Sequence, residues 1–517
     1  MNYNSDKTVL TFDSYRNDPI GEVEFSENLQ VIIFGWAFDQ SLDALKFPDS
    51  LCEITFGYAF NQSLSYTKLP NNIHTLTFGC LFNQSLDDVH LPDNLKTITF
   101  GTAFNQPLDK VSLPDNLRTI VFGVSFNQSL DFVSLPDNIQ TITFGCNFNQ
   151  PLDKIMFPSN LLNITFGKWF CQSLNKIASL KNLQYITFEH GIGESLYRTK
   201  LPESVKTIFF GNTFNKSLDR ITFPKSVKNI HIGMSFKCSL NNAKFPENLQ
   251  ILDIIGTFNK KIHKVTFPLS MHTINLGRSF NQSINKVTFP INLQVISFGY
   301  CFNQPLDKVN FPMSLLDITF GKKFNKSVDK LANMTNLQTI VFGHRFNQPF
   351  TVKFPISLRN ITLGQDFNQP LDKLNLHNIS FINDFNQPME NIKLPETLQT
   401  INFGNEFNQS LDNIHLPSTI HTITFGHNFN KPLDKIKFPM NLKSITFGFY
   451  FGYPVNNLPN QLEKLEFRTI HQNITNLPSS VKQIKINDDI KTSIKRLIKI
   501  PYGCKIVDYY DNEIKIE

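Results

Sequence analysis

A repeat of 22 residues runs through most of this 517-residue chain and limits the folds that it can adopt. Phe-Gly pairs recur at that step from Phe34-Gly35 onward, and a second Phe, followed by Asn, recurs from Phe60 onward. One unit reads L-x-x-I-x-F-G-x-x-F-N-Q-[SP]-L-D-x-V-x-[LF]-P-x-x. Because a unit this short buries its apolar face only against neighbouring units, the repeat predicts a solenoid.

Each unit contains one segment with the alternation of a β-strand. In residues 97–100, Thr-Ile-Thr-Phe, the Ile and the Phe would point inward. Gly101 follows, and its lack of a Cβ permits a backbone turn that is closed to other residues. The apolar residues between 108 and 113 predict a second, weaker strand that ends at Pro114, because proline cannot donate to a ladder.

Three columns of identical residues would run along the stacked units. Phe78 and Phe100 belong to one inner stack and Phe82 and Phe104 to another. Burying one Phe contributes roughly 1.5–3 kcal/mol, so these stacks would dominate the cohesion between units. The Asn after the second Phe, such as Asn61, would bond the backbone of the next unit, although a polar binding stripe is an alternative interpretation.

The motif Phe-Asn-Gln-Ser/Pro-Leu, with the following Leu-Pro and Ile-x-Phe-Gly, resembles the FNIP repeat family over roughly residues 29 to 452. These repeats are similar to leucine-rich repeats and are best known in giant DNA viruses and social amoebae. The resemblance implies a leucine-rich-repeat-like fold and an interaction role. Some relatives carry an N-terminal F-box that recruits a ubiquitin ligase, but about 28 residues precede the first clear unit here, too few for its three helices.

We therefore expect an all-β, leucine-rich-repeat-like, right-handed parallel β-solenoid of about twenty 22-residue turns with little or no helix. The pattern predicts an N-terminal cap over residues 1–28, the repeat solenoid over 29–452, degenerate turns over 453–489 and a C-terminal cap or tail over 490–517. The last segment is rich in Lys and Tyr. A capping β-unit is its first interpretation and a basic docking tail is the alternative.

Composition argues against several functional classes. The 49 basic and 43 acidic residues leave a net charge of +6, too little over this length to indicate a nucleic-acid or membrane partner. The seven Cys form no cluster with the spacing of a zinc site or a disulfide framework. The N-terminus lacks the pattern of a signal peptide, and no run of 18 apolar residues occurs. We expect a monomeric intracellular protein, cytoplasmic (in the host cell if viral), without metal or cofactor.

Catalysis needs unlike residues that converge in a pocket, whereas a solenoid places like residues in rows. One Asp per unit, often followed by Lys as in Asp109-Lys110, indicates a solvated edge rather than an acid–base or calcium site. The outward Thr-x-Thr pairs are similar to those of ice-binding solenoids, but residues such as Val121 and Phe209 interrupt the array. We therefore predict that the chain is not an enzyme, and ice binding is a distant alternative.

The two positions after each Phe-Gly pair are the least uniform of the unit. Positions that hold the fold repeat, and positions released from it vary. These residues are aromatic early in the chain, basic in the middle and then acidic, and aromatic residues and Arg are favoured at interfaces. The alternative is free drift of unconstrained loop residues. We predict a partner-binding rim made of Trp36, Tyr58, Lys168, Trp169, Arg278, Tyr300, Lys322, Lys323, His344, Arg345, Asp366, Asp384 and Glu406.

These observations favour a non-catalytic protein–protein interaction scaffold, working as an adaptor or a substrate receptor with a separate protein partner. A structural role, as a virion or fibrous component, is the alternative from another class. Size in solution separates them, since a scaffold stays monomeric and a fibrous protein forms filaments.

Overall fold

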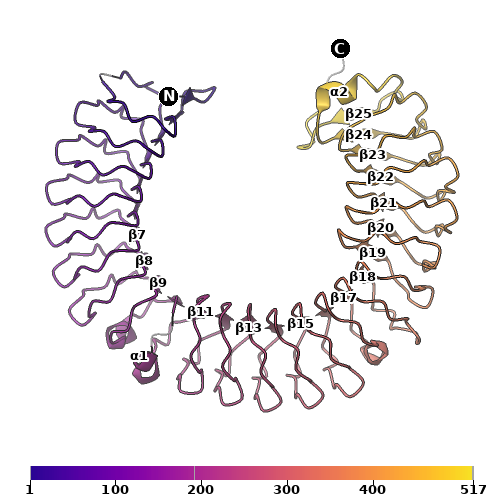
Figure 1. The fold of residues 1–517 in the computed structure, drawn as a ribbon, viewed down its shortest axis with the longest axis horizontal. Helices are drawn as coiled ribbons and strands as arrows, with labels where there is room; N and C mark the ends of the chain where they lie inside the picture. The colour runs from indigo at the N-terminus through magenta and orange to yellow at the C-terminus, as the bar shows by residue number, and fades with distance from the viewer. Residues whose placement is uncertain (1, 22, 191–192, 515–517) are drawn as a thin grey trace. The chain divides into compact units, whose positions relative to one another are not determined.

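The computed structural model describes residues 2–21, 23–190 and 193–514 and divides into two compact units, Met1–Gly256 and Thr257–Glu517. In each unit, every repeat contributes one short strand, and the strands of successive repeats lie side by side along the concave side (Figure 1). Each unit is a parallel β-solenoid with almost no helix, as the sequence predicts.

Unit 1 is built on twelve parallel strands in the described residues, with each strand paired to the next at a shift of one repeat. Thr97, for example, lies opposite Thr119. The outer edge of β2 pairs with the antiparallel strand β1 (Asn2–Tyr3). The twelve strands are β2 (Val9–Thr11), β3 (Val31–Ile33), β4 (Glu53–Thr55), β5 (Thr75–Thr77), β6 (Thr97–Thr99), β7 (Thr119–Val121), β8 (Thr141–Thr143), β9 (Asn163–Phe166), β10 (Tyr185–Phe188), β11 (Thr207–Phe210), β12 (Asn229–Ile232) and β13 (Ile251–Ile254).

Unit 2 repeats this arrangement. Its ladder stays in register across a repeat that is four residues short, where Asn360 lies opposite Asn378. The strands of the described chain in this unit are β14 (Thr273–Leu276), β15 (Val295–Phe298), β16 (Asp317–Thr319), β17 (Thr339–Val341), β18 (Asn360–Leu363), β19 (Asn378–Phe381), β20 (Thr400–Asn402), β21 (Thr422–Thr424), β22 (Ser444–Phe447), β23 (Lys464–Phe467), β24 (Gln483–Ile486) and β25 (Lys505–Val507).

The second strand predicted for each repeat is wrong. The rest of the repeat consists of three β-turns, which we call the first, second and third corners and which lie at residues 102–103, 109–110 and 115–116 of one repeat. Only three residues separate the second-corner segment from the proline, too few for a ladder. Each corner is closed by a backbone N–H bonding the C=O three residues earlier, as between Phe104 and Gly101 (3.3 Å), Val111 and Leu108 (3.1 Å), and Leu117 and Pro114 (3.0 Å).

The two predicted Phe columns are confirmed. Phe100 is 3% exposed and Phe104 is fully buried. Within the repeat their ring centroids lie 4.1 Å apart, and Phe100 lies 5.6 Å from Phe78 of the preceding repeat. Stacked rings of this kind contribute about 0.5–1.5 kcal/mol beyond the area that they bury, so the columns hold each repeat to its neighbours.

The glycine after the strand is required for a different reason from the one expected. The φ angle of Gly101 is not positive, so the turn itself does not demand glycine. A Cβ at Gly101 would instead collide with the carbonyl oxygen of Gly79 in the preceding repeat. Glycine permits this close approach of two backbones, and the stacking of repeats depends on it.

The Asn after the second Phe forms a ladder, as predicted. Oδ1 of Asn61 accepts a hydrogen bond from the backbone N–H of Asn83 (2.8 Å), and Oδ1 of Asn83 accepts one from Asn105 (2.8 Å). Gln84 adds a bond from Nε2 to the C=O of Asn61 (2.9 Å). These side chains are half-buried and bridge successive repeats, so the column is structural.

Within the residues that the structure describes, four short helical segments interrupt the coil. The 3₁₀ helices η1 (Asn175–Ser179) and η2 (Asp329–Asn333) occupy two repeats in which Leu180 and Met334 stand in place of the proline. Helix α1 (Gly193–Arg198) fills a degenerate repeat, and α2 (Ile490–Ile494) precedes the last strand. Strand β25 pairs in parallel with β24.

Candidate functional site

The predicted rim lies at the first corner, directly after each strand. There the backbones of successive repeats are bonded to one another, as in the bond from Ala59 N to Trp36 O (2.9 Å) and from Ala103 N to Cys80 O (2.8 Å). The main chain alone therefore holds the corner, and its side chains are not required for folding. First-corner side chains of adjacent repeats become neighbours along the rim.

In unit 1 the structure brings the predicted aromatic residues into two clusters. Trp36 and Tyr58 stack in parallel with centroids 4.8 Å apart, although they are 56% and 41% exposed. Farther along the same unit, Nζ of Lys168 lies 4.9 Å above the ring of Trp169. Both clusters expose flat apolar surface with a rigid geometry.

In unit 2 three cations surround one ring. The guanidinium of Arg278 lies 5.2 Å from the centroid of Tyr300, and the Nζ atoms of Lys322 and Lys323 lie 5.9 Å and 6.0 Å from it. Each such contact contributes about 0.5–1 kcal/mol at an exposed site. Four residues from three repeats thus form one basic cluster with an aromatic centre.

The basic and acidic zones of the rim are joined by polar side-chain contacts rather than separate. His344 Nε2 lies 3.0 Å from Asp384 Oδ2, and Arg345 Nη1 lies 3.1 Å from Asp366 Oδ2. Glu406, the last predicted residue, accepts a hydrogen bond from Asn428 Nδ2 (2.7 Å). Exposed pairs of this kind contribute about 0–1 kcal/mol, so they orient these side chains without adding much stability.

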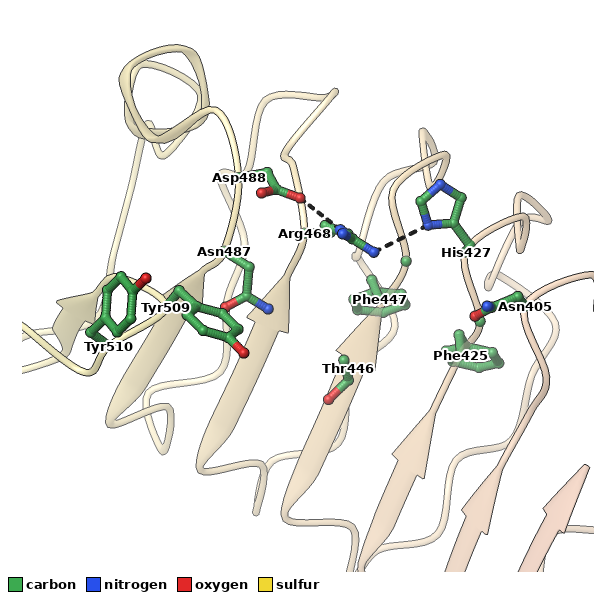
Figure 2. Close-up of a pocket in the computed structure, with 12 residues that line it drawn as sticks. Asn405, Phe425, His427, Thr446, Phe447, Arg468, Asn487, Asp488, Tyr509 and Tyr510 are labelled. Carbon is green, nitrogen blue, oxygen red and sulfur yellow. Dashed lines mark hydrogen bonds and ion pairs between the residues drawn. The ribbon is translucent and has the colours of Figure 1, made fainter. Parts of the chain in front are cut away.

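A hollow of about 540 Å³ near the C-terminal end of unit 2 was not predicted (Figure 2). Arg468 lies across it, with Nε 2.6 Å from Asp488 Oδ2 and Nη1 3.4 Å from His427 Nδ1. Tyr509 and Tyr510, which follow β25, line the other end. Asp488 and the Tyr pair come from degenerate turns, so the columns gave no signal for this end of the hollow. Only the Tyr pair after the last strand stands out in the sequence.

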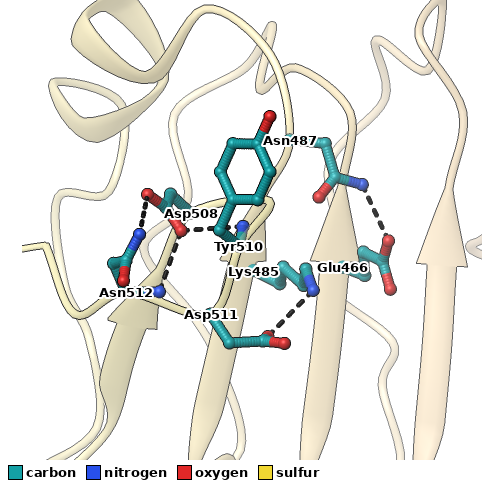
Figure 3. Close-up of polar contacts among 7 residues, drawn as sticks. All are labelled: Glu466, Lys485, Asn487, Asp508, Tyr510, Asp511 and Asn512. Carbon is teal, nitrogen blue, oxygen red and sulfur yellow. Dashed lines mark hydrogen bonds and ion pairs between the residues drawn. The ribbon is translucent and has the colours of Figure 1, made fainter. Parts of the chain in front are cut away.

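A polar network ties the chain after β25 to the strands before it (Figure 3). Lys485 Nζ lies 2.8 Å from Asp511 Oδ1, and this hydrogen bond raises the pKa of Lys485. Asp508 accepts hydrogen bonds from the side chain and backbone of Asn512, which lower the pKa of Asp508. The bonds fix the loop that carries Tyr509 and Tyr510 beside the hollow.

The Asp, Lys and Thr residues that recur in each repeat outside the rim have the chemistry of a solvated surface. Asp109 and Lys110 are exposed at the second corner, and the Thr pairs of the strands are half-buried. In the part of the chain that the structure describes, no three His, Cys, Asp or Glu side chains lie close enough to hold a metal ion. Nor does any helix of the described residues have the length and apolarity needed to cross a membrane.

A family model described as FNIP repeat matches the chain in thirteen places, at residues 17–59, 42–81, 60–103, 82–125, 104–147, 126–169, 194–235, 214–256, 258–301, 302–331, 346–378, 385–428 and 429–469. These matches cover most of the sequence. The chain belongs to the FNIP repeat family. Its Phe columns, close glycines and Asn ladder are therefore features of an FNIP solenoid.

One solved structure agrees with this assignment. The chain is similar to CroV588 from a giant virus, described as a novel circular leucine-rich-repeat protein, with 27% identity and a TM-score of 0.68 over 98% of this chain and 90% of that one. YopM from Yersinia enterocolitica matches at 13% identity and a TM-score of 0.34 over 93% of this chain and 91% of that one. A search of curated proteins found no significant match. The leucine-rich-repeat-like solenoid is a fold typical of protein-interaction scaffolds and is typically non-catalytic.

Proposed function

We propose that this FNIP protein is a non-catalytic protein–protein interaction scaffold, an adaptor or substrate receptor that binds a protein partner through the first-corner rim. The cluster of Arg278, Lys322 and Lys323 around Tyr300 carries the proposal. Tyr and Arg are enriched among the residues that dominate binding energy. Because the main chain holds this corner, the cluster has no role in folding that would explain it.

Two further observations support this function. The aromatic clusters of unit 1 would supply apolar anchors, and the basic cluster of unit 2 would orient a charged partner. Like residues stand in rows along the solenoid, which suits binding of an extended surface better than catalysis in a pocket.

The scaffold would act as a monomer. The outer edge of β2 is paired with antiparallel β1, and Val507 of β25 forms an antiparallel bridge with Glu513. Edge strands that are already paired within the chain oppose the end-to-end strand pairing between molecules that a fibrous component needs. Light scattering after size exclusion should give the monomer mass of 59.4 kDa, and filaments or larger assemblies would favour the structural alternative.

The rim is tested by reversing its charge. A tagged chain carrying Lys322→Glu, Lys323→Glu and Arg345→Glu should lose partners that the unchanged chain captures from its native cells, as measured by quantitative mass spectrometry. The matched control carries Lys431→Glu, Lys435→Glu and Lys437→Glu, three cations of the same unit outside the rim, and should capture the same set. If the rim variant also captures the same set, the rim is not the binding site.

A further inference from the structure

The third corner, the residue after each proline, differs in chemistry between the two units, each considered by itself. In unit 1 it is polar or charged throughout, as Asp49, Asn71, Asp93, Asp115, Asp137, Ser159, Glu203, Lys225 and Glu247. In the first three repeats of unit 2 it is Leu269, Ile291 and Met313, which are 69%, 67% and 50% exposed. Unit 1 shows that the corner folds with an acid, so these apolar side chains are not needed by the fold.

The three apolar side chains form a continuous row. The carbonyl oxygen of Leu269 accepts a hydrogen bond from Asn292 Nδ2 of the next repeat (2.9 Å), and that of Ile291 accepts one from Ser314 Oγ (2.6 Å). Behind the row, buried Phe289 and Phe311 stack with centroids 5.6 Å apart. The row therefore lies on packed aromatic rings and carries one apolar side chain per repeat.

A row of Lys runs parallel to it. The second corner of four successive repeats carries Lys264, Lys286, Lys308 and Lys330. None of these ammonium groups has an ion-pair partner within the described ranges, and like charges on adjacent strands are destabilising. In unit 1 the same position carries Ala44, Tyr66, Asp88, Phe132 and Asn242 as well as the cations Lys110, Lys154, Lys176, Arg198 and Arg220. The fold therefore does not require a cation at this corner.

The surrounding segment concentrates the positive charge of the whole protein. Residues 257–345 contain 11 Lys and Arg, three Asp and no Glu, a net charge of +8, whereas the entire chain has +6. The remainder is thus slightly acidic. An anionic partner would be attracted to this segment selectively and would relieve the repulsion within the Lys row.

We propose that this face, the Lys row together with the row of Leu269, Ile291 and Met313, binds an acidic amphipathic α-helix of a protein partner whose axis runs along the stack of repeats. A helix advances 5.4 Å per turn, close to the 5.6 Å between the rings of Phe289 and Phe311 in successive repeats behind the row. Its apolar residues at i, i+3/4 and i+7 would contact the apolar row, and Glu or Asp beside them would pair with the Lys row. Lys308 and Met313 are five positions apart in the sequence, so their Cα atoms lie at most about 17 Å apart, which accommodates a helix about 10 Å wide.

The apolar row distinguishes this partner from a nucleic acid. Phosphates would bind the Lys row, but bases gain their binding energy from aromatic rings, and Leu, Ile and Met offer none. A nucleic acid would leave the apolar row exposed to water. The inference rests on the proposed function, protein binding, but it uses a different corner of the repeat and names the chemistry of the partner.

The test uses a fluorescent synthetic peptide that is helix-favouring, with Leu at i, i+4, i+7 and i+11 and Glu on one flank. The control peptide has Lys in place of every Glu. Fluorescence anisotropy with the full chain should show binding of the acidic peptide, weakened by salt, and no binding of the control. Equal binding of the two peptides, or no binding of either, would overturn the proposal.

Two variants locate the site. Leu269→Asp/Ile291→Asp/Met313→Asp introduces the residue that unit 1 carries at this corner, so it should fold, as circular dichroism would verify, and should bind the peptide at least about tenfold more weakly. Lys264→Gln/Lys286→Gln/Lys308→Gln should lose similar affinity and most of the salt dependence. The matched control, Asp93→Asn/Asp115→Asn/Asp137→Asn in unit 1, should bind as the unchanged chain does.

Three further outcomes of these binding measurements decide between this proposal and its alternatives. Unchanged affinity in either unit 2 variant would overturn the proposal. Binding of polyuridylate RNA that depends on the Lys row but not on the apolar row, and that displaces the peptide, would also overturn it in favour of a nucleic acid. The rim variant Lys322→Glu/Lys323→Glu/Arg345→Glu should still bind the peptide, so the failure of this inference and the failure of the rim proposal are separable.

Discussion

The interior and the first corner of a single repeat follow different rules. The repeat position that Phe104 occupies is Phe in nearly every repeat. The residues at the adjacent first corner, by contrast, range from Trp36 and Tyr58 to Asp366 and Glu406. The Phe side chain is buried against both neighbouring repeats, so its shape is fixed. At the corner the contacts between repeats are made by backbone atoms, so the side chain is free to differ. Positions with the same residue in nearly every repeat therefore mark the side chains that stabilise the solenoid. Positions with variable residues mark the side chains that are available for binding.

The largest effect should come from a Phe column. Phe104→Ala removes a fully buried ring that stacks on Phe82 and Phe126 at 6.1 Å, which should cost about 3–5 kcal/mol. Both Trp of the chain lie in unit 1, so Trp fluorescence in a urea titration reports its unfolding. Phe132→Ala, at an 80% exposed position, is the control and should cost less than about 0.5 kcal/mol. Equal midpoints for the two variants would contradict the distinction between interior and surface.

A smaller loss should follow from Gly101→Ala. The added methyl group would meet the carbonyl oxygen of Gly79, a backbone atom that cannot move alone. Displacing the repeat should cost about 1–3 kcal/mol, measured by the same titration. At Gly21 a Cβ would meet nothing within 4 Å, so Gly21→Ala should leave the midpoint almost unchanged. A harmless Gly101→Ala would show that the close approach is not required.

The Asn ladder should contribute less again. Asn83→Ala removes the acceptor of the backbone N–H of Asn105 (2.8 Å) and of Gln106 Nε2 (3.2 Å), which should cost about 1–2 kcal/mol. Asn72, an exposed donor to the C=O of Asp49 (2.7 Å), is the control, because water replaces its bond when it is changed to Ala. Equal losses from the two changes would mean that the ladder position has no special role.

The smallest effect on folding should come from the rim. Trp36→Ala removes only the stacking on Tyr58 and should cost about 0.5 kcal/mol, followed through the fluorescence of Trp169. If unit 1 unfolded as easily in this variant as in Phe104→Ala, the rim would be part of the core.

The strands, the Phe columns and the Asn ladder were predictable from the sequence because each is a side-chain pattern that recurs with the repeat. The Leu-Pro segment was misread as a strand, because its apolar spacing matches a strand while the corners that interrupt it are defined by backbone bonds such as Val111 N to Leu108 O. The role of Gly101 was also hidden, since the atom that excludes a Cβ belongs to another repeat.

The candidate site was less predictable than the fold. Variation identified the rim, but not that Arg278, Lys322 and Lys323 gather around Tyr300, because that depends on how long side chains cross between repeats. The pairing of His344 with Asp384 spans 40 residues and two repeats, so the contacts expected between neighbouring repeats do not predict it. The C-terminal hollow forms where regular repeats meet degenerate turns that carry Asp488 and Tyr509, and no repeated column predicts side chains in those turns.

Hydroxyl-radical footprinting of the intact chain, analysed by mass spectrometry, tests the separation of interior from rim most directly. The account predicts that Phe60, Phe82, Phe104 and Phe126 are protected, while Trp36, Tyr58, Trp169 and Phe132 are oxidised in the same sample. Oxidation of the four column residues at rates like those of Trp36 and Trp169 would contradict it.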